Sequence, residues 1–191
     1  MTIKMNKITE QSFINAAKKI GCSVAMVKAV YEVESQGSGF LPTGEVKILF
    51  EPHIFWKELR NKGIKPIVSD ICYPIWGTKP YGKVSEQHKR LERAVQIDRD
   101  AALKSASWGL FQILGTNYKL CGCVSIQGFI NKMSAGEESQ LELFVNYIIN
   151  THLDDEMRQE DFAGFARGYN GPAYTKNNYD KKIEAALKKY R

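Results

Sequence analysis

The chain has 191 residues, 43% of them apolar and 25% charged, with 27 Lys and Arg against 21 Asp and Glu, for a formal net charge of +6. These are the values of an ordinary globular protein, and they exclude intrinsic disorder, a collagen-like repeat and a small disulfide-rich scaffold. The length, with no linker-like stretch, predicts one domain over residues 1–191. We expect this domain to act as a monomer.

The sequence contains no export or membrane-spanning segment that we recognise. No stretch reaches the roughly 20 apolar residues of a transmembrane helix, and the basic residues 1–7 lead into a polar run instead of the apolar segment of a secretory signal. We therefore expect synthesis in the cytosol, with the four cysteines reduced. Cys121-Gly122-Cys123 is too tightly spaced for a zinc half-site, so no metal and no cofactor is expected.

Apolar residues at helical spacing dominate the sequence and predict a mainly α-helical α+β fold. Most of the expected helices begin at a Ser, Thr or Asp that can cap a helix, and Ser134-Ala135-Gly136-Glu137 has the form of a capping box. The expected helices run from Thr9 to Gly21, Ser23 to about Ser35, Ser85 through Ala102, Ser125 to about Met133, Ser134 to about Ile148, Asp161 through Phe165 to an end before Gly171-Pro172, and Tyr179 to Tyr190.

One region near the N-terminal part has the pattern of a small β-hairpin. Phe40-Leu41 and Val46–Phe50 are apolar and flank Pro42–Glu45, which has the composition of a turn. The following segment, from about Asn61 to Lys83, is irregular and carries Pro66, Pro74 and Pro80 among the aromatics Tyr73, Trp76 and Tyr81. A structureless connection of that length is unusual and often functional.

Two glutamates of the second predicted helix face different ways. Glu34 lies about 20° from Val27 and about 40° from Val30, in the middle of the apolar stripe, whereas Glu32 lies about 160° from Glu34, beside Lys28. Burial and the negative end of the helix dipole both raise the pKa of a carboxyl. An acid that stays protonated near neutral pH suits general-acid cleavage of a glycosidic bond. A buried glutamate paired with a Lys or Arg is the structural alternative.

A second carboxylate, Glu51, follows the far arm of the predicted hairpin. If that strand end returns toward the helix of Glu34, the two carboxylates face each other across a cleft. Strand alternation leaves Glu51 neither clearly buried nor clearly exposed. The nearby His53 is expected to be structural.

Three separated segments resemble the lysozyme-like lytic transglycosylases and goose-type lysozymes, and they are Glu34-Ser35-Gln36-Gly37, Ser107–Ile113 and Phe165–Pro172. A closer similarity, over nearly the whole chain, is to the N-acetylmuramidase family of phage and prophage endolysins. The segments that carry it are Glu34–Phe40, Ile48–His53, Ser105–Ile113, Glu138–Leu141 with Phe144, and Tyr169–Tyr174.

This resemblance implies a lysozyme-like fold and a bacteriolytic enzyme that cleaves the β-1,4 bond between N-acetylmuramic acid and N-acetylglucosamine in peptidoglycan. Carried over by position, Glu34 is the catalytic acid and Glu51 the second acidic group. A lytic transglycosylase that works with one carboxylate and forms 1,6-anhydro ends, and a non-catalytic wall-binding module, are the alternatives. Many members carry a separate wall-binding module before this domain, whereas this chain begins almost at the first expected helix. We therefore expect wall affinity to come from the domain itself, after release to the wall by a holin-type pore.

Five further residues are expected to bind substrate, each with a structural alternative. Gln112 can hydrogen-bond an N-acetyl group or be a satisfied buried amide, and Trp108 can stack on a sugar or fill the core. Tyr169 and Asn170 lie before Pro172 and can instead be a core aromatic and a helix-end residue. Ser35 can instead bond the backbone at its helix end.

The last expected helix is basic and amphipathic. Residues 175–191 contain six Lys and Arg but only Asp180 and Glu184 as acids. Such a helix attracts anionic surfaces such as lipopolysaccharide or phospholipid headgroups, unless it is only a solvated helix face. Nucleic acid is not an expected partner, because the basic residues are dispersed and no nucleic-acid motif is present.

Overall fold

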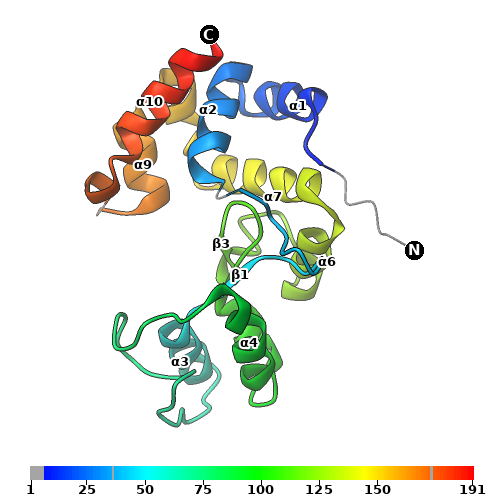
Figure 1. Cartoon of the computed structure of the whole chain (residues 1–191), viewed down its shortest axis with the longest axis vertical. Helices are drawn as coiled ribbons and strands as arrows, with labels where there is room; N and C mark the ends of the chain where they lie inside the picture. The colour runs from blue at the N-terminus through cyan, green and yellow to red at the C-terminus, as the bar shows by residue number, and fades with distance from the viewer. Residues whose placement is uncertain (1–6, 36, 173) are drawn as a thin grey trace.

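The computed structural model describes residues 7–35, 37–172 and 174–191 (Figure 1). Helices dominate this part of the chain and accompany a small antiparallel sheet, which confirms the mainly helical α+β class. The α-helices are α1 (Glu10–Ile20), α2 (Val24–Glu34), α3 (Pro52–Asn61), α4 (Gln87–Val95), α5 (Arg99–Lys104), α6 (Ile126–Ala135), α7 (Glu137–Asn150), α8 (Asp154–Gln159), α9 (Phe162–Asn170) and α10 (Tyr179–Tyr190). The strands are β1 (Ile48–Phe50), β2 (Ala106–Trp108) and β3 (Ile113–Leu114).

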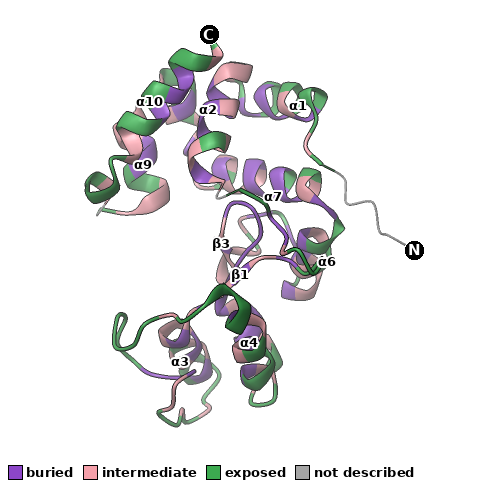
Figure 2. Ribbon diagram, in the orientation of Figure 1, coloured by how far each residue is buried: buried purple, intermediate pink, exposed green. Residues whose placement is uncertain are grey.

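The helices gather at two ends of the molecule, with the sheet between them. In Figure 1, α1, α2, α9 and α10 occupy one end and α3 and α4 the other. Helix α10 packs on α2 and α9, α1 packs on α2 and α7, and α5 packs on α3 and α4. Figure 2 shows buried residues on the inner sides of α2, α7 and α10 and along the sheet, where the core lies. No helix in the described residues is both long enough and apolar enough to span a membrane.

Short polar side chains fix most helix starts where the sequence predicts them. Thr9, Ser23, Ser125 and Asp161 each accept a hydrogen bond from a backbone N–H of the first turn, which satisfies a donor that the helix itself leaves unpaired. Gly21 ends α1 in the left-handed conformation, with φ +85°. These four starts and the end at Gly21 confirm the prediction from local sequence.

Two predicted helix starts are wrong. Ser85 lies inside a 3-10 turn, Val84–Glu86, and the long helix expected after it is two helices, because the chain turns after Val95 and Asp98 caps α5. Ser134 lies within α6, where its hydroxyl donates to the carbonyl of Ile130, and α7 begins after Gly136 without a side-chain cap. The expected capping box at Ser134–Glu137 therefore does not form.

The strand pairing of the sheet differs from the predicted hairpin. Phe40 and Val46 form a single isolated bridge across the predicted turn, so only the tip of the expected hairpin exists. The strand β1 pairs instead with β2, in the register Ile48 with Trp108 and Phe50 with Ala106, and β2 pairs with β3. The helices α3 and α8 were also not predicted.

A buried amide clamps the loops that follow Glu34 and β2. The side chain of Gln140, on α7, is fully buried; its Oε1 accepts from the Leu110 backbone N–H at 2.7 Å and its Nε2 donates to the Met133 carbonyl at 2.8 Å. Gly39 and Gly109 lie so close to this amide that a Cβ at either would collide with it, and Gly109 also has a φ of +72°. Gln140 therefore ties the loop after β2 to α6 and α7, and the loop after Glu34 packs closely against its amide.

We expect Gln140→Leu to lower the free energy of unfolding by about 1–3 kcal/mol, because it leaves the Leu110 N–H and the Met133 carbonyl buried without partners. Urea unfolding followed by circular dichroism measures the change. Gln11→Leu is the control, since Gln11 is exposed on α1 and a surface change there should stay within about 0.5 kcal/mol. Equal effects of the two substitutions would contradict the clamp.

Candidate active site

The carboxyl of Glu34 is buried at the end of α2. Glu34 is the last residue of that helix and only 8% exposed, as its helical phase predicts, whereas Glu32 is exposed. Glu32 does not pair with Lys28, as its spacing suggested, but with Lys189 at 2.8 Å, because α10 packs along α2. Burial raises the pKa of Glu34 to about 7, and the Asn170 hydrogen bond and the charge of Lys182 partly oppose this rise.

The hydrogen-bond partner of Glu34 is a neutral amide. Asn170, the last residue of α9, donates from Nδ2 to Glu34 Oε1 at 2.9 Å. None of the ion pairs among the described residues includes Glu34, so the alternative of a glutamate locked to a Lys or Arg does not hold there. An amide orients the carboxyl without forcing it to ionise, in contrast to a cation.

Glu34 borders a pocket of about 300 Å³. It brings together three of the residues expected in the site, Gln112, Tyr169 and Asn170, with the carboxyl of Glu34. The other lining residues are Phe111, Ile113, Leu114, Asn117, Tyr147 and Tyr179. A hollow of this size, with one carboxyl among amides, hydroxyls and rings, has the chemistry to hold part of a sugar.

The turn between β2 and β3 positions Gln112. Gln112 has a positive φ of +49°, uncommon for a residue with a side chain, and its Nε2 donates to the Gly109 carbonyl at 2.8 Å. The Tyr169 hydroxyl donates to the Phe111 carbonyl at 3.0 Å, and the Tyr169 ring stacks on Phe165. Backbone strain of this kind often marks functional positions, because the surrounding structure must hold it in place.

Two of the expected substrate-binding residues, Trp108 and Ser35, do not line the pocket. Trp108 is 4% exposed, and its Nε1 donates to the Leu103 carbonyl at 3.0 Å, so the ring fills the core and presents no face for a sugar. Ser35 caps the end of α2 through its backbone N–H, which donates to Tyr31, and does not line the pocket. Gln36, part of the segment Glu34–Gly37, lies outside the described residues.

Glu51 lies away from this pocket. It follows β1 and precedes α3, and its carboxylate accepts from the Tyr81 hydroxyl at 2.5 Å and lies 3.6 Å from His53 Nδ1. Burial raises the pKa of Glu51, and the bond from Tyr81 and the charge of His53 oppose the rise. Because β1 and β3 flank β2 on opposite sides, about 10 Å separates the strand before Glu51 from the strand that lines the pocket.

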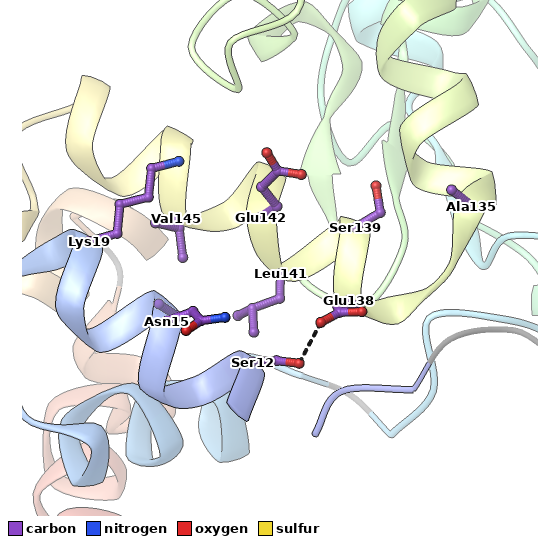
Figure 3. Close-up of a pocket in the computed structure, with 10 residues that line it drawn as sticks. Ser12, Asn15, Lys19, Ala135, Glu138, Ser139, Leu141, Glu142 and Val145 are labelled. Atoms are coloured by element: carbon purple, nitrogen blue, oxygen red, sulfur yellow. Dashed lines mark hydrogen bonds between the residues drawn. The ribbon is translucent and has the colours of Figure 1, made fainter. Parts of the chain in front are cut away.

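A second hollow, of about 410 Å³, lies between α1 and α7 and shares no lining residue with the first (Figure 3). Several of its polar groups already have partners. Ser12 donates to Glu138 at 2.8 Å, as the dashed line in Figure 3 marks, and Lys19 donates to Asn146 at 2.6 Å. None of the residues expected in the site lines this hollow, in contrast to the pocket of Glu34.

Sequence reasoning missed several residues of the pocket. Tyr179 opens α10, Tyr147 lies on α7 and Asn117 ends a 3-10 turn. Each looks like an ordinary helix or turn residue in the sequence, and only tertiary packing brings them beside Glu34. No local signal identifies them.

Comparisons with known proteins identify the family and the fold of the chain. The chain matches the N-acetylmuramidase family over residues 23–191. It is similar to the crystal structure of the Burkholderia AP3 phage endolysin, with a TM-score of 0.90 and 36% identity over 96% of this chain and 70% of that one, so the fold is lysozyme-like as expected. No curated protein matches the chain. The chain belongs to the N-acetylmuramidase family and is a glycoside hydrolase that acts on peptidoglycan.

Proposed function

We propose that Glu34 is the general acid that cleaves the β-1,4 bond between N-acetylmuramic acid and N-acetylglucosamine. The observation that carries this proposal is a carboxyl, 8% exposed, whose pKa burial raises to about 7 at the edge of a sugar-sized pocket. Such a group holds its proton near neutral pH and gives it to the departing glycosidic oxygen. The carboxylate left behind then faces the positive charge that develops on the sugar ring.

The neighbouring amides supply orientation. Asn170 donates to Glu34 Oε1 and so fixes the orientation of the carboxyl at the edge of the pocket. Gln112, on a strained turn that lines the same pocket, is placed to bond the N-acetyl group of a bound sugar. Tyr169 supports the wall of the pocket through its bond to Phe111.

Glu51 remains the proposed second acidic group, which orients water or stabilises the positively charged transition state. Its partial burial and raised pKa support this role. Its position outside the pocket of Glu34 favours the second candidate, a lytic transglycosylase that uses Glu34 alone while the muramic 6-hydroxyl attacks. Mass spectrometry of the released fragments separates the two reactions, because hydrolysis leaves reducing ends and the transglycosylase leaves 1,6-anhydro ends.

We expect Glu34→Gln to lower the release of soluble fragments from purified peptidoglycan by about 10²–10⁴-fold, since it keeps the shape of the side chain and removes its proton. Glu32→Gln, two residues away on the outer face of α2, is the matched control and should keep activity. Near wild-type cleavage by Glu34→Gln would refute the acid assignment. Binding to peptidoglycan without any cleavage by the wild-type protein would favour a wall-binding module.

The raised pKa of Glu34 also links stability to pH. Between about pH 4.5 and 7 the folded carboxyl keeps a proton that the unfolded chain has lost, so this group's contribution to stability falls as pH rises through that range. At pH 8 we expect Glu34→Gln to be more stable than the wild type by about 1–3 kcal/mol, and at pH 4 by less. Urea titrations at both pH values measure this. Glu32, whose pKa is lowered by Lys189, should show no such gain on change to Gln.

Location and assembly follow from the same reading. We propose that the protein is made in the cytosol, reaches the wall through a holin-type pore and acts as a monomer. The helix α10 is proposed to attract anionic envelope surfaces by charge alone, because Ile183 and Leu187 are buried and α10 packs on α2, so its apolar face is not free to enter lipid.

Deleting residues 175–191 would not test this surface, because it uncovers α2 and removes Tyr179 from the pocket. Charge reversal does. We expect Lys176→Glu/Lys181→Glu to weaken binding to phosphatidylglycerol vesicles by about tenfold, measured by co-sedimentation at low salt. Both lysines are exposed, Lys181 on α10 and Lys176 in the 3-10 turn Tyr174–Asn177 just before it; we call this pair the α10 variant. Lys182, whose charge lowers the pKa of Glu34, stays in place.

The matched control is Lys65→Glu/Lys89→Glu, which changes the net charge equally at exposed positions of the other end of the molecule. Similar losses for the two double variants would mean that net charge, and not α10, attracts the protein to the vesicles. Loss of peptidoglycan cleavage by the α10 variant would mean that the helix serves the site rather than a surface.

A further inference from the structure

A highly exposed tryptophan projects from the irregular segment between α3 and α4. Trp76 is 69% exposed and its neighbour Ile75 is equally exposed, whereas Trp108 is 4% exposed. Figure 2 shows most of this segment in green. Large apolar side chains on a surface next to polar groups often mark a ligand-binding site, and an aromatic face can stack on the C–H face of a sugar ring. Nothing in the function described so far uses this ring.

Hydrogen bonds tie the exposed ring to Glu51. Trp76 Nε1 donates to the Tyr81 hydroxyl at 2.9 Å, and that hydroxyl donates to Glu51 Oε2 at 2.5 Å. The indole, the phenol and the carboxylate thus form one continuous chain, from the open surface to a half-buried acid. The ring has a defined position relative to the carboxylate instead of turning freely in solvent.

A buried glutamine holds this chain against the sheet. The side chain of Gln87, 1% exposed, donates from Nε2 to the Tyr81 carbonyl at 2.7 Å and accepts from the Phe50 backbone N–H at 3.0 Å. Arg90 donates to the same Tyr81 carbonyl at 2.6 Å. Because Phe50 directly precedes Glu51, one side chain fixes both ends of the Tyr81–Glu51 contact. Such preorganisation lowers the entropy cost of binding a ligand there.

The base of the segment is also anchored. Arg93 donates to both carboxylate oxygens of Asp70 at 2.7 Å, and Arg90 donates to the Asp70 carbonyl at 3.2 Å. Ile71, Cys72 and Tyr73 are buried immediately afterwards, so the exposed stretch begins at Pro74. The segment therefore presents Trp76 from a fixed support.

We propose that Trp76 and Tyr81, next to Glu51, form a second sugar-binding subsite for the glycan strand, separate from the pocket of Glu34. Trp76 stacks on a sugar ring, and Tyr81 positions the Glu51 carboxylate beside it. This subsite rests on the proposed function, because it takes the same peptidoglycan strand as its ligand. A strand that occupies both sites crosses the sheet from the β3 edge to the β1 edge, a path of about 10 Å between the strands.

The test uses the exposure of the three tryptophans. In Glu34→Gln, which leaves the strand uncut, acrylamide quenching of fluorescence reports mainly Trp76, since Trp56 is half-buried and Trp108 is buried. We expect soluble uncrosslinked glycan strands to reduce this quenching, and Glu34→Gln/Trp76→Phe to lose most of that reduction. Unchanged quenching at saturating strand concentration would overturn the proposal.

Kinetics on the otherwise wild-type protein give an independent readout. We expect Trp76→Ala to raise KM for glycan strands by about tenfold with little change in kcat, and Trp76→Phe to restore much of the loss. Tyr81→Phe keeps the aromatic ring but loses the hydrogen bond to Glu51. We therefore expect it to raise KM more than Trp76→Phe does. The control is Val124→Ala, which shortens a 97% exposed apolar side chain in another part of the molecule and should leave KM unchanged.

These outcomes separate the two proposals. Activity of Glu34→Gln would refute the acid assignment. The quenching of Trp76 fluorescence tests strand binding at the subsite, and its result does not depend on cleavage. Equal KM values for Trp76→Ala and the wild type, with both folded by circular dichroism, would refute the subsite and leave the acid assignment standing.

Discussion

The removal of one carboxyl from water is the constraint on which the proposed function of this molecule depends. Glu34 ends a helix whose apolar side faces the core, and α9 contributes a neutral amide, from Asn170, where a cation would have forced ionisation. The same burial that keeps the proton available makes the ionised form costly, so the fold gives up stability at the site where it gains chemistry. The surrounding structure must therefore supply compensating order, and the clamp made by Gln140 is one clear source of it.

Local sequence signals were sufficient to predict several helix starts and the burial of Glu34. The caps at Thr9 and Ser23 and the phase of Glu34 follow from residues three or four positions apart, and all three agree with the structure. Family resemblance added Asn170 and Gln112, which helical spacing alone did not distinguish from ordinary helix-end and buried amides, and both border the pocket with Glu34.

Features that depend on contacts between distant segments could not be predicted from such local signals. Strand β1 pairs with β2, far along the chain, so the hairpin inferred from a local turn exists only as a single bridge, and Glu51 lies on the opposite edge of the sheet from the pocket. Trp108 has a ring of the type that stacks on sugars, but its strand pairing with Ile48 places it in the core. The exposed ring is that of Trp76, in a segment without any periodicity. Aromatic type alone does not separate these two positions, because burial is decided by the sheet.

The pocket also joins distant parts of the chain. Glu34 receives its hydrogen bond from a residue 136 positions later, and Tyr179 on the helix that packs along α2 lines the same pocket. A growing polypeptide that has emerged from the ribosome only as far as the sheet therefore has Glu34 but neither the amide that bonds it nor the helix that packs along α2. The proposed site is assembled late in synthesis, when the last helices dock, so incomplete chains in the producing cell lack it.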